Sequence, residues 1–157
     1  MEDVTFRNAR SADVPRLVEL LRHGALDEHK EDHAELSGYR SALAEIQATD
    51  GSDVLVAEVD GEIVAMCQLI VFRHFQRRGG RCAEVESMHV HPDFRGNGIG
   101  AQLLDAAVDV ARRSGCYRIQ LTSNVQRTDA HRFYERHGFA PSHLGFKRLL
   151  ELPDQPS

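Results

Sequence analysis

Two carboxylates stand two residues apart in a stretch that alternates like a strand. Glu84 and Glu86 lie within residues 82–91, which we expect to form a β-strand. Successive side chains of a strand point to opposite faces, so both carboxylates should share one face, together with Met88 and Val90. A carboxylate there can accept a proton from an amine, or Glu86 can hold a cationic amine without accepting its proton. Two solvated carboxylates are the alternative.

Three glycines open the helix that is predicted to follow this strand. They occur in the run Arg95-Gly96-Asn97-Gly98-Ile99-Gly100, and the helix should cover residues 99–113. Glycines leave backbone N–H groups uncovered, and the helix dipole adds partial positive charge, so this turn is suited to phosphate. Gly100 is followed by Ala101-Gln102, which excludes a nucleotide P-loop. The glycine spacing also excludes a dinucleotide-binding fingerprint.

A basic loop precedes the carboxylate strand. It spans residues 73–81 and contains Arg77 and Arg78, whose guanidinium groups can bind an anionic part of a substrate such as a carboxylate or phosphonate. The alternative is an ordinary exposed hairpin tip. We therefore treat Arg77 and Arg78 as candidate substrate-binding residues.

Neither the cysteines nor the histidines form a catalytic or metal-binding motif. His29 and His33 are four residues apart and could share a metal with Asp32 on a helix, but the stretch has the composition of a solvated loop, so no metal site is expected. The cysteines are odd in number and include no CxxC pair, which favours a reducing compartment and ordinary packing roles. They are Cys67, Cys82 and Cys116.

Composition limits the class of protein. A chain of 157 residues fits one domain, residues 1–157, with its own core. The net charge of −5 argues against general binding to nucleic acid. No apolar run reaches transmembrane length, and Glu2 and Asp3 stand where a signal peptide would begin. We therefore expect a cytoplasmic protein without a membrane partner.

The hydrophobic pattern predicts an α+β fold, an α/β three-layer arrangement in which a mixed, largely antiparallel sheet is flanked by helices. Ser11 should cap the first helix, Asp60-Gly61 should turn a hairpin, and Thr128 or Asp129 should cap the last helix. The predicted strands are residues 4–9, 54–59, 62–71, 82–91 and 117–122, with one or two more in 139–152. The predicted helices are residues 12–22, 39–48, 99–113 and 128–137.

The glycine turn and its flanks resemble the GNAT superfamily of N-acetyltransferases. The turn fits the family pattern R/Q-x-x-G-x-G/A and follows Val90-His91-Pro92, and residues 129–139 fit the family's A-x-x-x-Y-x-x-x-G-F helix. Residues 121–134, with Ser142-His143 and Phe146, resemble aminoalkylphosphonate N-acetyltransferases more narrowly. The resemblance implies a GNAT fold with a splayed central strand pair and acetyl-CoA as cosubstrate.

The resemblance also implies roles for single residues. Glu84 occupies the place of a general base, and Tyr134, on the helix face it shares with Ala130, is the expected general acid toward the thiolate that leaves. The Met88 amide faces the acetyl oxygen and the Val90 backbone faces pantetheine. Asn124 is expected to bind cofactor amides. The groups expected around the pyrophosphate belong to Arg95, Gly96, Gly98, Ile99, Gly100 and Ala101.

These features predict direct acetyl transfer from acetyl-CoA to a primary amine of a small molecule, with an anionic group on the amine as one option. A protein or peptide N-acetyltransferase and a non-enzymatic acyl-CoA-binding sensor are the alternatives. The acceptor pocket is expected among residues 23–48, 73–81 and 141–147. Exposed late strands would allow a homodimer.

Overall fold

A computed structural model describes residues 3–25 and 30–150. The chain forms two compact units, the first ending at Leu121 and the second beginning at Thr122. The predicted division into one domain stays a prediction. Among the described residues, no helix is long and apolar enough to cross a membrane. His29 and the last two residues of the predicted late strands lie outside the described ranges.

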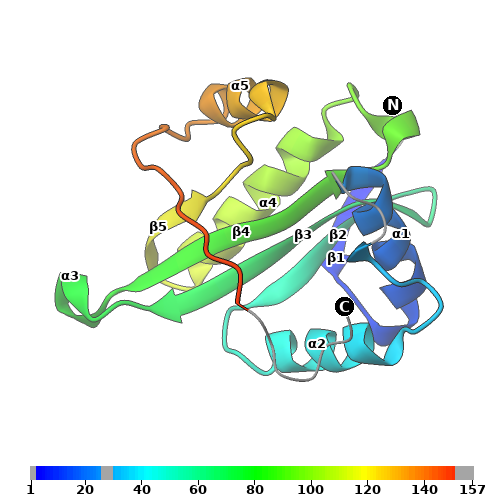
Figure 1. The fold of residues 1–157 in the computed structure, drawn as a ribbon, viewed down its shortest axis with the longest axis horizontal. Helices are drawn as coiled ribbons and strands as arrows, with labels where there is room; N and C mark the ends of the chain where they lie inside the picture. The colour runs from blue at the N-terminus through cyan, green and yellow to red at the C-terminus, as the bar shows by residue number, and fades with distance from the viewer. Residues whose placement is uncertain (1–2, 26–29, 151–157) are drawn as a thin grey trace. The chain divides into compact units, whose positions relative to one another are not determined.

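The first unit is built on a five-stranded sheet with the order β1-β2-β3-β4-β5 (Figure 1). Adjacent strands pair antiparallel from β1 to β4, and β4 pairs parallel with β5. This confirms the predicted α+β class and the largely antiparallel sheet. The parallel pair lies at one edge of the sheet, not at its centre. The strands are β1 (Val4–Asn8), β2 (Asp53–Val59), β3 (Glu62–Arg73), β4 (Arg81–Val90) and β5 (Cys116–Leu121).

The hairpin between β2 and β3 turns at the predicted dipeptide. Asp60 and Gly61 both have positive φ, at 50° and 80°. Two consecutive residues with positive φ form the mirror-image turn that matches the right-handed twist of antiparallel strands. This connection fixes the register of the two most buried strands, on which the rest of the sheet is assembled.

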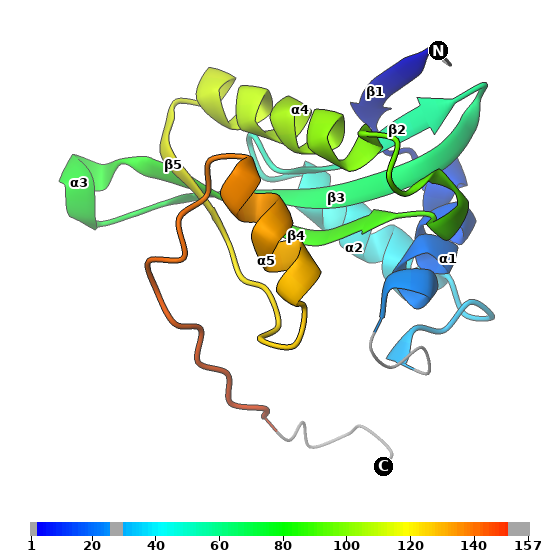
Figure 2. The same cartoon turned by 90° about the horizontal axis from the view of Figure 1, so that it is seen from above.

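Helices cover both faces of the sheet. Helices α1 (Val14–Gly24) and α2 (Ser37–Gln47) lie on one face and α4 (Ile99–Arg113) on the other (Figure 2). Side chains alternate along β2, so apolar residues of this strand pack on both faces of the sheet. Val54 and Val56 join the cluster formed with α1 and α2, whereas Leu55 lines a hollow with residues of α4. The three-layer arrangement predicted from the sequence is therefore present.

The helix starts differ from the prediction. Ser11 does not cap α1; it opens a short 3₁₀ turn, η1 (Ser11–Asp13), and the Asp13 carboxylate accepts the backbone N–H of Arg10 at 2.7 Å. Asp13 is held in place by Arg7, which also pairs with Glu58. The Asp13 carboxylate thus satisfies a backbone donor that precedes the turn, whereas a Ser11 cap would have accepted an N–H that follows it.

The second unit contains one helix, α5 (Thr128–Arg136), among its described residues. Its N-cap is Arg127 and makes no side-chain capping bond, so Thr128 and Asp129 lie inside the helix and do not cap it. The Asp129 carboxylate is engaged by Arg132 within the helix.

The strands predicted for the end of the chain are absent from residues 139–150. Pro141 provides no N–H for a ladder, and Ser142 donates instead to the carbonyl of Ala140 at 2.8 Å. Without a partner strand, an alternating sequence has no ladder to satisfy its backbone. Residues 139–150 therefore offer no strand for the predicted homodimer, which stays a prediction. Four large hydrophobic side chains of this stretch are exposed: Leu144, Phe146, Leu149 and Leu150.

Candidate active site

The candidate active site is organised by an irregularity in β4. Met66 of β3 pairs with His89 and Gln68 pairs with Glu86, so three steps along β4 match two steps along β3. Ser87 lies in this interval and has a positive φ of 49°, which is uncommon for a residue other than glycine. One extra residue opposite a regular strand is a β-bulge. The bulge therefore lies between the carboxylates and the end of β4.

The bulge reverses the side-chain alternation that the sequence predicts. Residues paired across an antiparallel ladder point to the same face, and Met66 and Gln68 share one face of β3. Glu86 therefore shares its face with His89. The prediction that the carboxylates share a face with Met88 and Val90 is wrong, because it assumed an unbroken period of two.

Two histidines that sequence reasoning missed, His89 and His91, lie on the same face as Glu84 and Glu86. This face is turned toward α1: a Cβ on Gly24 of α1 would lie 1.8 Å from Nδ1 of His89. Only glycine at position 24 permits so close an approach. A period-two pattern that switches from even to odd positions is the one signal that could have revealed the histidines.

The two carboxylates are held as a pair. The Gln120 side-chain amide, on neighbouring β5, donates to Glu84 Oε2 at 2.8 Å. Partial burial, together with the hydrogen bond and negative charge of Glu84, raises the pKa of Glu86. A carboxyl whose pKa is raised in this way can exchange protons closer to neutral pH.

Beyond the bulge, the side of β4 that faces β5 has no strand partner among the residues that the structure describes. The pairing of β4 with β5 ends at Val85 and Leu121, whereas β4 continues to Val90. His91 N–H donates to Val64 of β3 at 2.8 Å, so by alternation the N–H and C=O of Val90 point away from β3. The same alternation directs the N–H of Met88 to that side. Both residues thus present backbone groups where the parallel pair separates.

The glycine turn follows the end of β4. After η3 (Pro92–Phe94), Gly96 and Gly98 adopt positive φ values of 81° and 78°. Gly98 is the N-cap of α4 and makes no side-chain capping bond. Gly100 and Ala101 lie with Ile99 in the first turn of α4, whose N–H groups have no partner within the helix. Such a turn is a cradle for an anion.

Arg95 is held at the rim of this turn. Its Nε donates to the carbonyl of Val90 at 3.0 Å, which uses one of the five guanidinium N–H groups. The bond ties a positive charge to the open end of β4. The predicted phosphate-binding residues, from Arg95 to Ala101, are therefore contiguous with the backbone groups of Met88 and Val90.

Comparisons with known proteins agree with this geometry. The model of the acetyltransferase (GNAT) family matches residues 15–139. The chain belongs to the GNAT acetyltransferase family. It is 38% identical over 91 residues to an aminoalkylphosphonate N-acetyltransferase from Salmonella typhimurium, which covers 58% of this chain and 58% of that relative. The chain thus spans little more than half the length of this curated relative.

Two longer matches cover nearly the whole chain. An L-methionine sulfoximine/L-methionine sulfone acetyltransferase from Salmonella typhimurium is 29% identical over 152 residues, covering 96% of this chain and 84% of that protein. A crystal structure from Bacillus halodurans C-125, described as a transcriptional regulator, is 35% identical with a TM-score of 0.89 and covers 94% of this chain and 100% of that one. The GNAT fold predicted from the motifs is confirmed.

Two predicted site residues of this GNAT chain belong to the second unit: Asn124 lies before α5 and Tyr134 lies on it. Asn124 Oδ1 accepts the N–H of Gln126 at 2.9 Å, a local turn that fixes the entry to the helix. Tyr134 is half-buried and packs edge-on against Phe133 and Phe139, with ring centroids 5.2 Å and 5.9 Å away. The assignment of Asn124 to cofactor binding and of Tyr134 to proton transfer stays a prediction.

The basic loop lies at the other end of β4 from the glycine turn. Arg77 and Arg78 form the single turn α3 (Gln76–Gly79) with left-handed φ values of 54° and 57°. The Arg77 guanidinium lies 5.5 Å from the ring centroid of Tyr117. Five residue steps along β4, about 16 Å, separate Arg81 from Glu86, and the two arginines lie beyond Arg81. The assignment of Arg77 and Arg78 to substrate binding stays a prediction, and it requires an acceptor that extends well beyond Glu86.

A small apolar cavity of about 140 Å³ lies between α1, α2 and the sheet. Ser87 of the bulge and Gln68 reach its wall, and Tyr39 lines it from α2. Cavities of this size admit a group as large as a benzene ring. Part of the predicted acceptor region, residues 23–48, therefore borders on the bulge. The remaining lining residues are apolar: Val14, Leu17, Val18, Leu21, Ala42, Leu43, Ile46, Val54 and Met66.

The cysteines have the character predicted for packing residues. All three are free. Burial raises the pKa of Cys67 to about 12, and burial also raises the pKa of Cys116. Neither thiol is therefore poised as a thiolate nucleophile. This favours transfer without an acyl-enzyme.

Replacing Glu86 by Gln should change stability in a pH-dependent way. The folded-state pKa of Glu86 is raised, so the neutral carboxyl stabilises the fold below the unfolded pKa of about 4.3, and this contribution is lost as pH rises through the folded pKa. Gln stays neutral, so the stability of Glu86→Gln relative to wild type should increase as pH rises from about 4 through the folded-state pKa of Glu86. Urea unfolding at several pH values measures this difference.

The matched control is Glu45→Gln, an exposed carboxylate on α2. Its stability difference from wild type, measured over the same pH range, sets the baseline. A Glu86→Gln difference that follows this baseline would contradict the raised pKa and remove the electrostatic reason to treat the two carboxylates as a pair.

Proposed function

We propose that this protein is an acetyl-CoA-dependent N-acetyltransferase that transfers acetyl directly to the primary amine of a small molecule. One observation carries the proposal: the backbone of β4 opens toward β5 immediately before an uncapped glycine turn. A thioester with a pyrophosphate arm requires an anion cradle and a free backbone donor next to one another. Membership of the family supports the same assignment.

The cosubstrate would be held largely by main-chain groups. The N–H groups around Gly98, Ile99, Gly100 and Ala101 would bind the pyrophosphate, with Arg95 adding charge and Gly96 shaping the turn. The Val90 backbone would bind pantetheine, and Asn124 is proposed to bind its amides. The Met88 N–H would stabilise negative charge on the acetyl oxygen, a role that typically lowers a barrier by ~3–4 kcal/mol.

Proton transfer would use the carboxylate pair and a tyrosine. Glu84, oriented by Gln120, is proposed to accept the amine proton, and Glu86 to hold the cationic amine. The raised pKa of Glu86 beside Glu84 supports a shared role, since a proton taken up by one carboxylate is stabilised by the other. Tyr134 is proposed to protonate the thiolate that leaves.

The acceptor is proposed to be a small amine, and the named relatives support this class. One is described as acting on aminoalkylphosphonates and another on methionine sulfoximine and methionine sulfone. Both descriptions combine a primary amine with a polar or anionic group. The apolar cavity beside Ser87 would receive an uncharged part of such an acceptor. Peptide acetylation and acyl-CoA sensing are the rival functions.

Acetyl-CoA at about 100 times its Kd should stabilise the fold by about 2.7 kcal/mol, measured as a rise in Tm. Gly98→Val should remove most of this rise, because Gly98 has positive φ at the N-cap of α4. Gly115→Val is the matched control, since Gly115 has a φ of 74° just beyond the other end of α4 and open space around it. Loss of the rise in both variants, or its absence from wild type, would contradict the proposed cradle.

Glu84→Gln should lower kcat most at low pH, where an unaided amine is almost fully protonated, and activity should recover as pH rises. Glu86→Gln should act mainly on the KM for the amine. Equal, pH-independent losses in both Glu variants would contradict separate roles.

Tyr134→Phe should lower kcat by roughly 10²–10⁴-fold with little change in acetyl-CoA affinity. An unchanged kcat in this variant would leave Tyr134 a packing role.

A competition assay tests the acceptor class. Release of free CoA thiol would be followed with aminoethylphosphonate, ethylamine and a short peptide at equal concentration. We expect the anionic amine to be acetylated faster than ethylamine, and Arg77→Ala/Arg78→Ala to keep that preference, since both arginines lie at the far end of β4. A peptide preferred by tenfold or more would favour the protein-acetyltransferase rival. Acetyl-CoA binding without turnover of any amine would favour the sensor.

A further inference from the structure

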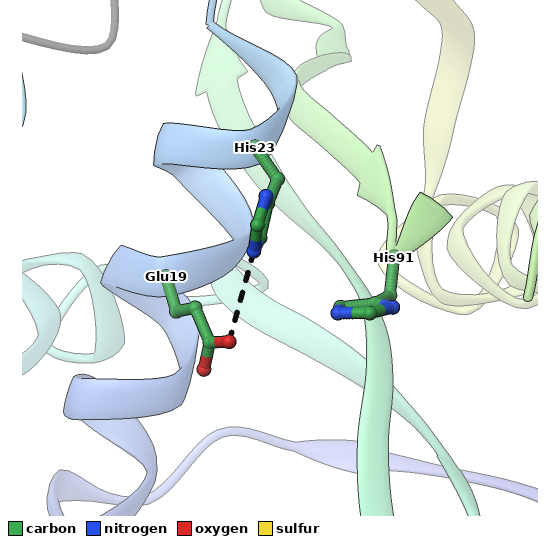
Figure 3. Close-up of side chains that lie close together, drawn as sticks. All are labelled: Glu19, His23 and His91. Atoms are coloured by element: carbon green, nitrogen blue, oxygen red, sulfur yellow. Dashed lines mark ion pairs between the residues drawn. The ribbon is translucent and has the colours of Figure 1, made fainter. Parts of the chain in front are cut away.

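A second cluster of polar side chains lies apart from the carboxylate pair, where the end of β4 meets α1. Glu19 and His23 are one helical turn apart on α1, and His91 follows the last residue of β4. Figure 3 shows the three side chains grouped together, with one ring nitrogen of His91 pointing toward the other two. One possible ligand atom from each residue lies within 4.8 Å of the others. The proposed acetyl transfer gives this cluster no task.

From this arrangement we propose a binding site for one divalent transition-metal cation, of which Zn²⁺ is the reference case. Two imidazoles and one carboxylate are a ligand set typical of zinc and of its neighbours cobalt and nickel. The sequence pattern predicts no metal site and does not bring these residues together. His23 and His91 are 68 positions apart, and the bulge in β4 turns His91 toward α1.

The distances suit a site that closes on the ion. His23 Nε2 lies 3.7 Å from Glu19 Oε1. Two atoms each about 2.1 Å from a tetrahedral metal are about 3.4 Å apart, so this pair already has nearly the required spacing. The three ligand atoms lie within 4.8 Å of one another, so closing on an ion requires a shift of up to about 1.4 Å, which rotation of the exposed Glu19 and His23 side chains provides. Water would fill the remaining coordination position.

The surroundings hold the carboxylate ligand in place. Arg16 contacts Glu19 Oε2 at 2.8 Å, which leaves Oε1 directed toward His23. Arg16 is itself fixed by the carbonyl of Ile63 and the carboxylate of Glu62. Its positive charge lowers the affinity of the site for a cation but fixes the geometry of its carboxylate.

His91 also has an outer partner. The Asp93 carboxylate Oδ2 lies 3.7 Å from Nδ1 of His91, and the Asp93 N–H donates to that same nitrogen at 3.3 Å. If Nε2 binds the metal, Nδ1 carries the ring hydrogen, so it no longer accepts the Asp93 N–H and donates to the Asp93 carboxylate instead. Ligating histidines usually have such a partner on their second nitrogen. The metal would then link α1 to the segment that leads into the glycine turn.

Tag-free protein, dialysed against a chelator, would be titrated with Zn²⁺ by calorimetry and with Co²⁺ by visible absorption. We expect one equivalent to bind, with cobalt d–d bands of low coordination number and a Zn²⁺-dependent rise in Tm. His23→Ala, His91→Ala and Glu19→Gln should each weaken binding at least tenfold and remove the rise in Tm. Circular dichroism without metal checks that each variant is folded.

The matched control is His74→Ala, which removes a half-buried histidine just after β3, at the opposite end of β4, and should bind Zn²⁺ as wild type does. Wild-type protein that binds no metal, or His23→Ala/His91→Ala protein that binds it unchanged, would overturn the proposal. None of these binding readouts depends on acetyl transfer, so the metal site can be disproved while the proposed enzyme activity stands.

Discussion

The extra residue in β4 is the constraint on which both sites depend. Ser87 accepts a left-handed conformation, and this shifts every later residue of β4 by one position relative to β3. As a result His89 and His91 join Glu84 and Glu86 on the face toward α1. Without the bulge, Met88 and Val90 would occupy that face, and the histidines would point to the layer of α4. Strain of this kind persists only where the surrounding ladder holds it, and here β3 pairs on both sides of it.

The same strand is open along one edge because its parallel partner stops early. β5 ends at Leu121 while β4 continues to Val90, so backbone donors and acceptors remain without a ladder. Such edges invite pairing with another chain unless something else covers them. Arg95 satisfies the Val90 carbonyl from the turn beyond, which protects part of the edge and leaves the neighbouring N–H groups directed toward β5. An open edge next to an anion cradle is suited to an extended ligand with a phosphate at one end.

Much of this architecture could be predicted because hydrophobic period and turn chemistry act locally. The Asp60-Gly61 turn and the start and end of α4 follow from residue types within a few positions. The bulge could not be predicted, since serine carries no signal for positive φ. The late strands were predicted wrongly because alternation describes one strand, whereas a strand exists only with a partner. The predicted caps at Ser11 and Thr128 are also absent. Arg7 fixes Asp13, and Arg132 engages Asp129, and a capping pattern records neither pairing.

The two halves of the proposed reaction differ in how well a sequence can encode them. Binding of a shared cosubstrate relies on main-chain groups, which require glycines at fixed spacing and therefore leave a motif. Selection of an acceptor relies on side chains from α1, α2 and the bulge, which meet only after folding and can vary without disturbing the sheet. The cavity wall at Tyr39, Gln68 and Ser87 illustrates this, because its members come from three separate elements. For this reason the family membership of the chain follows from its motifs, whereas the acceptor must be identified by competition between amines.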